Sequence, residues 1–185
     1  ASNIVSLDLK DTGVNKLTEH SISSSTLTTL SLDGVLEIDS EAIYNCPNLT
    51  DIDLGDDVEI IMNKAFYNAK CSKFILPKSL KAYVTDSFSD GNSYTKHNEG
   101  GGESGAYDLP TLKLADGFDT SNWYHLVVNS NNMDKRLDDL WLSYIKDPTK
   151  FDSKNLDENV SSVDDTVELI TPIDSLSYQT YYFHQ

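Results

Sequence analysis

A short apolar pattern is repeated along residues 27–90, and this repetition limits the possible folds more than any other feature of the sequence. The two clearest copies begin 22 residues apart, at Leu27 and Leu49, and read LTTLSLDGVLEIDSEAIYNC and LTDIDLGDDVEIIMNKAFYNA. A more divergent copy begins 23 residues later, at Ser72, and a shorter one begins at Ile4. Self-similarity at such a period is typical of solenoids, so the sequence predicts about four stacked coils.

The spacing within each copy has a physical cause. In Leu-x-x-Leu-x-Leu the last two apolar residues alternate with polar ones, as in a short strand with one buried face. In the second copy Val58 and Ile61 then supply another apolar edge, and Ala65-Phe66 a third. One coil alone has too small a core, whereas stacked coils share a continuous one. Chance repetition within ordinary α/β packing is the alternative, and the eight or nine coinciding positions argue against it.

These residues resemble the BspA-type leucine-rich repeat, a family found in surface proteins of bacteria and some protists. The resemblance covers about residues 1–90 and rests on the Leu-x-x-Ile-x-Leu strand, the Val-x-x-Ile edge and the Ala-Phe-Tyr-Asn ending. Two departures are present: Asp39 and Met62 stand where glycine is usual, and the copy from Ser72 lacks its alanine. The resemblance implies a surface recognition scaffold, often adhesive, with no catalytic residues.

The predicted fold class is an α/β repeat solenoid with a short curved sheet, followed by a small α+β module. Three segments are expected: the solenoid at 1–93, a glycine-rich linker or loop at 94–105, and the module at 106–185, which either caps the solenoid or continues into an adjacent domain. Within this module strands are expected at 111–114, 123–128, 166–170 and 177–183. An amphipathic helix is expected from about residue 131 to before Pro148, and a polar connector at 149–165.

Strand residues that point away from the core should line one concave sheet surface. The candidate binding residues there are Asp8, Thr29, Ser31, Asp33, Asp51, Asp53, Lys73 and Ile75. The middle of this surface is acidic, which predicts a partner with basic residues. The alternative is a merely solvated surface on a protein that is acidic throughout. No Asp-x-Asp-x-Asp-Gly loop appears, so no calcium site is predicted.

The charge of the chain excludes some classes of partner. A formal net charge of -16 and a pI near 4.3 disfavour nucleic acid and anionic membranes, since both require positive fields. No apolar run approaches the roughly 18 residues of a membrane span, so membrane insertion is not expected. Two isolated cysteines, Cys46 and Cys71, make a poor metal site, and no metal or cofactor is predicted. Whether they form a disulfide is left open.

No catalytic residue is predicted. The four histidines, His20, His97, His125 and His184, are scattered and form no His-Glu-x-x-His pattern. An aromatic group in the last third of the chain either lines a sugar- or peptide-binding surface or builds the core of a small domain. Its members are Trp123, Tyr124, His125, Trp141, Tyr144, Tyr178, Tyr181, Tyr182 and Phe183.

The sequence therefore predicts a secreted or cell-surface binding and adhesion protein that is not an enzyme. Its partner would be a protein or glycoprotein, a host-derived one included, recognised by the concave surface. One alternative is an enzyme or toxin fragment in which the repeats are a targeting arm and residues 106–185 are catalytic. Another is a structural spacer. Polar groups converging around His125 would favour an enzyme, and a shallow surface without a cleft would favour binding.

Overall fold

The structure is a computed structural model of the 185-residue chain. It describes residues 3–84, 87–88, 94–99, 102–107, 110–128, 141–143, 145–147, 160–164 and 180–184. For 94–99, 102–107, 125–128, 160–164 and 180 it describes the backbone without the side chains.

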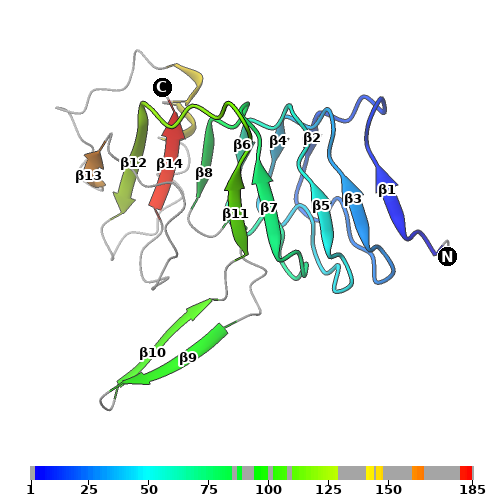
Figure 1. The fold of residues 1–185 in the computed structure, drawn as a ribbon, viewed down its shortest axis with the longest axis horizontal. Coiled ribbons are helices and arrows are strands. Elements are labelled where there is room, and N and C mark those ends of the chain that lie inside the picture. Colours follow the sequence, from blue (N-terminus) through cyan, green and yellow to red (C-terminus); the bar gives the residue numbers. More distant parts are fainter. Residues whose placement is uncertain are drawn as a thin grey trace.

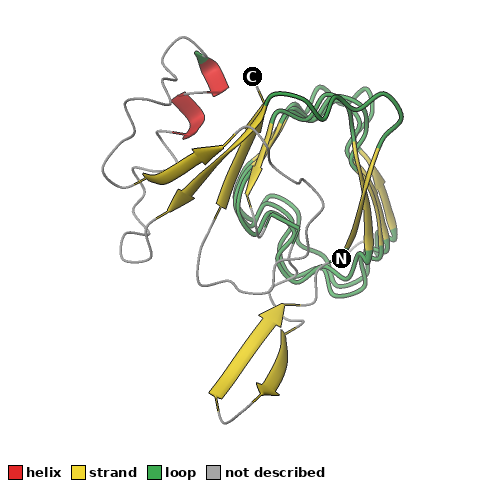
Figure 2. Ribbon diagram, turned by 60° about the vertical axis from the view of Figure 1, so that its left-hand side comes forward, coloured by secondary structure: helices red, strands yellow, loops and turns green. Residues whose placement is uncertain are grey.

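The first half of the chain winds into a stack of coils, and each coil contributes one strand to each of two rows (Figures 1 and 2). The first row consists of β1 (Ser6–Asp8), β3 (Thr29–Ser31), β5 (Asp51–Asp53) and, beside it, β7 (Lys73–Leu76). The second row consists of β2 (Lys16–Leu17), β4 (Glu37–Ile38), β6 (Ile60–Ile61) and β8 (Ala82–Val84). The paired strands within both rows are parallel, because successive coils of a solenoid run in the same direction.

The register places equivalent residues of successive copies side by side. In the first row Leu30 pairs with Leu7 on one side and with Ile52 on the other. The third apolar residue of the Leu-x-x-Leu-x-Leu pattern is at most 2% exposed in three copies, and all three residues belong to one apolar core: Leu32, Leu54 and Leu76. The shared core predicted from the repeats is therefore confirmed.

The third edge of each coil is a turn. Successive coils meet there through isolated parallel bridges, one joining Ile22 to Ile43 and one joining Cys46 to Ala69. Within residues 3–84 the structure contains strands and turns and no α-helix, so the predicted α/β class was wrong for the repeats. The few residues between Ile38 and Ile43 are too short for a helix, which in proteins averages three to four turns.

Ser87 joins the most divergent copy, which begins at Ser72, to the coil before it. It occupies the position held by alanine in the other copies and is 0% exposed. Its hydroxyl donates to the carbonyl oxygen of Ile61 over 2.9 Å and accepts the backbone N–H of Val84 over 2.8 Å. A buried hydroxyl is tolerated because both of these bonds are made.

Residues 94–105 were predicted to be a glycine-rich linker or loop, and most of them lie in two strands. β9 (Tyr94–Glu99) pairs antiparallel with β10 (Gly102–Tyr107) in a hairpin that projects from the coils in both views (Figures 1 and 2). The sequence gives no apolar alternation here. A hairpin whose pairing depends on backbone hydrogen bonds leaves little trace in side-chain pattern.

The described residues after 106 extend the two rows of the solenoid. β11 (Thr111–Leu114) pairs in parallel with β7, so that Leu114 lies beside Leu76. β14 (Thr180–His184) pairs antiparallel with β8, β12 (Trp123–Val128) with β14, and β13 (Val160–Asp164) with β12. β11 and β12 thus trace a further coil, with β14 inserted between β8 and β12 in the seven-stranded sheet.

Several expectations for this region are settled by these strands. The strands at 111–114 and 123–128 are confirmed, and residues 180–183 of the one expected at 177–183 lie in β14. The prediction of a polar connector at 149–165 was wrong at its C-terminal end, where residues 160–164 form β13. The sequence gives no strand signal there because Val160 and Val163 are separated by two serines and so do not alternate with polar residues. The strand expected at 166–170 lies outside the described residues. A separate α+β module is not confirmed, because the described part is mostly sheet and pairs with the coils.

A second apolar cluster covers the outward side of β8 and β14. Strand alternation in β14 directs Tyr182 toward the solenoid core and its neighbours toward this cluster, whose buried members are Ile60, Ala82, Val84, Trp141, Tyr181 and Phe183. Residues 141–143 and 145–146 are helical, in agreement with the predicted helix, of which 131–140 lie outside the described part. The Trp141 indole N–H donates to the carbonyl oxygen of Tyr182 over 3.1 Å, which fixes the helical segment on the sheet.

Truncating Leu54 should destabilise the whole stack. Leu54→Ala removes side-chain volume from a site that is 2% exposed, and such changes cost about 2–5 kcal/mol of unfolding free energy. Leu36→Ala is the matched control, because Leu36 is 40% exposed and should change stability by only about 0.5 kcal/mol. Urea denaturation followed by circular dichroism measures both. Equal losses in the two variants would contradict a shared core.

Restoring the repeat's usual alanine at position 87 should destabilise the protein. Ser87→Ala leaves the Val84 N–H and the Ile61 carbonyl buried without the hydroxyl, at a cost of about 1–3 kcal/mol. Ser79→Ala is the control: its hydroxyl donates to the carbonyl oxygen of Val58 over 2.8 Å but is only half-buried, so water can replace it. Urea midpoints of the two variants give the comparison, and a gain in stability for Ser87→Ala would refute the assignment.

Candidate functional site

The first strand row presents two lines of polar side chains that run across the coils. The register puts Ser6, Thr29 and Asp51 in one line. It puts Asp8, Ser31 and Asp53 in the other. Because side chains alternate along a strand, the intervening Leu30 and Ile52 face the core while these residues face outward.

An open hollow of about 610 Å³ lies over these lines. It brings together six of the eight predicted binding residues: Asp8, Thr29, Ser31, Asp51, Asp53 and Lys73. The edges of Leu7, Leu30 and Ile52 contribute apolar floor. The hollow therefore combines carboxylates, hydroxyls and one amine over a partly apolar base. Groups of these kinds can bind the surface of another protein.

Two predicted residues lie elsewhere. Asp33 borders a separate hollow of about 310 Å³ formed by the turns after β1, β3 and β5, with Lys10, Asp11, Gly34, Asp56 and Asp57. Ile75 is 55% exposed on β7 but does not line the main hollow. Residues that the sequence analysis did not select also line it: Thr50, Cys71 and Ser72. They directly precede β5 and β7 and lie outside the alternating pattern of the strands, so that pattern does not select them.

Local turn chemistry holds the ends of the strands in place. The Asp8 carboxylate accepts the N–H of Lys10, and the Asp53 carboxylate accepts the N–H of Gly55, each over 2.9 Å. Gly55 has φ +73° and lies against the turn of the preceding coil: a Cβ there would lie 2.9 Å from the Asp33 Cα and 3.1 Å from its backbone nitrogen. Glycine is therefore required for the coils to approach each other at this point.

Three side chains with raised pKa values, Cys46, Tyr83 and Tyr182, lie in or against the solenoid core. Burial raises the pKa of Tyr83, with a smaller contribution from neighbouring Tyr182, and burial also raises the pKa of Tyr182. The two rings stack with centroids 4.8 Å apart, which joins β8 to β14. Burial likewise raises the pKa of the Cys46 thiol, which keeps it protonated in its small slot. These groups are structural, and none of them lines the hollow.

The two cysteines are free. Cys46 is buried at the position that Ala69 holds in the next copy, as predicted. Cys71 is half-buried, borders the hollow, and its thiol donates to the carbonyl oxygen of Lys73 over 3.0 Å.

The predicted aromatic group is mainly core. The side chains of its described members that are at most 5% exposed are Trp123, Trp141, Tyr181 and Phe183. His125, Tyr144 and Tyr178 have no described side chains, so the surroundings of the His125 side chain, which would distinguish an enzyme from a binding protein, lie outside the described part. No helix among the described residues is long and apolar enough to span a bilayer.

Comparison with known proteins places the first half of the chain. The family model for the BspA type leucine rich repeat region matches residues 1–96 with 6 copies. Over the same residues the described strands define four coils. Neither a curated protein nor a solved structure matches the chain at a significant level.

Substituting Gly55 should disturb the packing of the coils beneath the hollow. Gly55→Ala meets the Asp33 backbone, whereas Gly13→Ala, at nearly the same φ of +80°, meets nothing within 4 Å. Both variants carry the backbone cost of a positive φ, about 1–2 kcal/mol. Gly55→Ala should lose a further 1–3 kcal/mol, roughly, by overpacking. Thermal unfolding of the pair provides the measurement, and equal shifts would mean that the close approach is absent.

Proposed function

Because the chain belongs to the BspA-type leucine-rich repeat family, we propose that it is a binding and adhesion protein that recognises a partner with the first strand row. The family suggests recognition through repeats. The partner that fits best is a protein or glycoprotein with basic residues. A host-derived ligand of this kind is consistent with a secreted or surface-attached protein, as members of the family generally are.

One observation carries this proposal: the open hollow in which six predicted binding residues meet. Asp8, Asp51 and Asp53 lie along its length, and all three are exposed. Lys73 lies at the β7 end. Such a surface attracts a basic patch over most of its area and repels a misplaced one at Lys73, so charge selects the orientation of the partner.

The coil architecture also favours binding by a rigid surface. Strand pairing joins the outward residues of β1 and β5 to those of β3 between them, and the strands are anchored by a continuous core. A partner therefore meets little ordering cost on this side of the interface. Shape fixed in advance is what a recognition scaffold needs.

The enzyme alternative receives no such support from the described side chains. The family is typically non-enzymatic, and the described aromatic residues of the last third pack in the core. The spacer alternative predicts no ligand at all. A binding experiment that includes charge variants of the hollow separates it from recognition.

Neutralising two carboxylates in the hollow should weaken binding. Asp51→Asn with Asp53→Asn removes two negative charges and keeps the side-chain oxygen that accepts the Gly55 N–H. Binding to immobilised extracellular-matrix proteins and mucin should fall about tenfold or more, as for two lost charge pairs of about 1 kcal/mol each. Biolayer interferometry at low and high salt measures the change.

The matched control is Asp56→Asn with Asp57→Asn. These exposed carboxylates lie in the turn after β5 and border the other hollow, so the same total charge is removed outside the proposed surface. The control should bind within twofold of the unmodified protein. Equal weakening in both double variants would mean that binding depends only on the net charge of the protein. Unchanged binding in the Asp51→Asn, Asp53→Asn variant would mean that the hollow does not bind the partner.

A further inference from the structure

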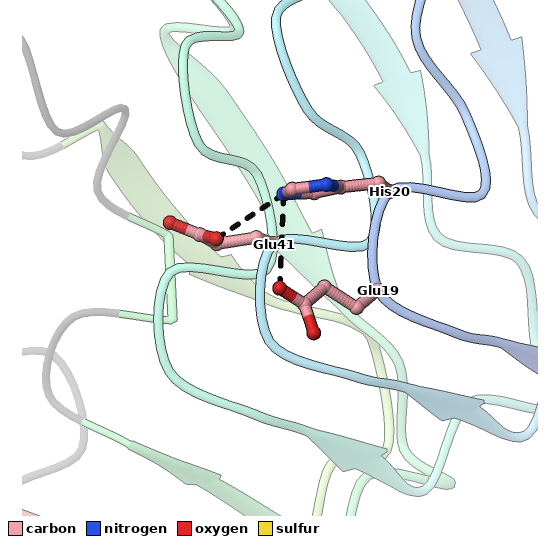
Figure 3. Close-up of side chains that lie close together, drawn as sticks. All are labelled: Glu19, His20 and Glu41. Carbon is pink, nitrogen blue, oxygen red and sulfur yellow. Dashed lines mark hydrogen bonds and ion pairs between the residues drawn. The ribbon is translucent and has the colours of Figure 1, made fainter.

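Three side chains with metal-binding chemistry converge outside the first strand row. The Nε2 atom of His20 lies 3.3 Å from a carboxylate oxygen of Glu41 and 3.8 Å from a carboxylate oxygen of Glu19. The three ligand atoms all lie within 4.8 Å of one another. Figure 3 shows both glutamates directed at the same edge of the imidazole ring.

The repeat places His20 and Glu41 at equivalent positions of neighbouring coils. The backbone N–H of His20 donates to the carbonyl oxygen of Glu41 over 2.9 Å, and that of Glu41 donates to Lys64 in the next coil over 3.0 Å. His20, Glu41 and Lys64 all have left-handed backbone, with φ of 58°, 54° and 50° respectively. This conformation is uncommon for residues other than glycine, and its recurrence shows that the coil directs each of these side chains outward from the same turn.

Packing restrains the histidine ring. The centroid of the His20 ring lies 4.1 Å from that of Tyr44, and Tyr44 in turn stacks on Tyr67 at 5.6 Å. His20 is about half exposed, with 47% of its side chain accessible, so its ring is held from one side and remains accessible to solvent. A ligand that is already oriented loses less entropy when an ion binds.

The separations suit a small ion with tetrahedral coordination. Zn²⁺ binds imidazole nitrogen and carboxylate oxygen at about 2.0–2.2 Å, which places neighbouring ligand atoms roughly 3.4 Å apart. The distances from Nε2 to the two carboxylates bracket that value. Ca²⁺ requires six to eight oxygen ligands, and an imidazole is a poor substitute for one of them. The ligand set therefore favours a transition metal over calcium.

We propose that Glu19, His20 and Glu41 form a binding site for a divalent transition-metal ion, best matched by Zn²⁺. The three side chains occupy three positions of a tetrahedron and leave the fourth open toward solvent. Water fills that position in the isolated protein, and a ligand atom from a bound partner can replace it. The net charge of -16 raises the concentration of cations at the surface and favours loading.

The sequence analysis predicted no metal site because these ligands do not form a local motif. Glu19 and His20 are adjacent, and Glu41 follows a full coil later, so the spacing matches the repeat and no metal-binding pattern. The site depends on the stacking of the coils and is independent of the hollow over the first strand row.

Calorimetric titration of the full chain with Zn²⁺ tests the site. One equivalent should bind, and His20→Ala and Glu41→Gln should each weaken that binding at least tenfold, with Glu19→Gln also weakened. The matched control is Glu59→Gln, which removes the charge of a partly exposed carboxylate that pairs with Lys81 at 3.4 Å. It should bind Zn²⁺ within twofold of the unmodified protein, and circular dichroism should show that all variants are folded.

A second titration, with Ca²⁺, separates the site from a general attraction of cations to an acidic surface. The proposal expects Ca²⁺ binding that is at least tenfold weaker and is unaffected by His20→Ala. Two results would overturn it: Zn²⁺ binding that is equal in His20→Ala, Glu41→Gln and Glu59→Gln, or no Zn²⁺ binding by the unmodified protein. The contacts of His20 with Glu19 and Glu41 would then be only a surface feature of the stacked coils.

Discussion

The structure depends on the contact between each coil and the next. Backbone hydrogen bonds join neighbouring coils in both strand rows and at the turns, and the apolar residues inside stack in register, with Leu32, Leu54 and Leu76 in one core. Neither element is sufficient alone, because a two- or three-residue strand buries too little surface to stay paired and a single coil encloses no interior. Repetition makes the two cooperative, so one buried substitution affects every coil that shares the core.

The last coil is completed by strands from distant parts of the chain. β11 continues the first strand row, while β14 enters between β8 and β12 and reverses the direction of pairing. Tyr83 and Tyr182 stack across this junction, and Trp141 covers the outward side of the sheet. A solenoid whose end strand stayed unpaired would expose both backbone groups and core, which makes such a cap necessary at this end.

Both candidate sites depend on the repeat, but each depends on a different feature of it. The hollow follows from strand alternation, which directs Asp51 and Asp53 outward while Ile52 faces the core. The group formed by Glu19, His20 and Glu41 follows from the stacking of equivalent turns. Alternation is visible in one copy of the repeat, whereas stacking becomes visible only when the register between copies is known.

The sequence by itself determined the coils, because apolar spacing at a fixed period specifies which residues must be buried and leaves one way to bury them. It therefore predicted the core, the strands of the first row, the apolar edge that forms the second row, and six of the residues around the hollow. Only the tertiary structure decided how β11 to β14 join the solenoid, where Thr50 and Cys71 lie, and which polar turn residues meet across coils. Those contacts join residues far apart in the chain through backbone pairing, and backbone hydrogen bonds place few demands on the identity of the side chains.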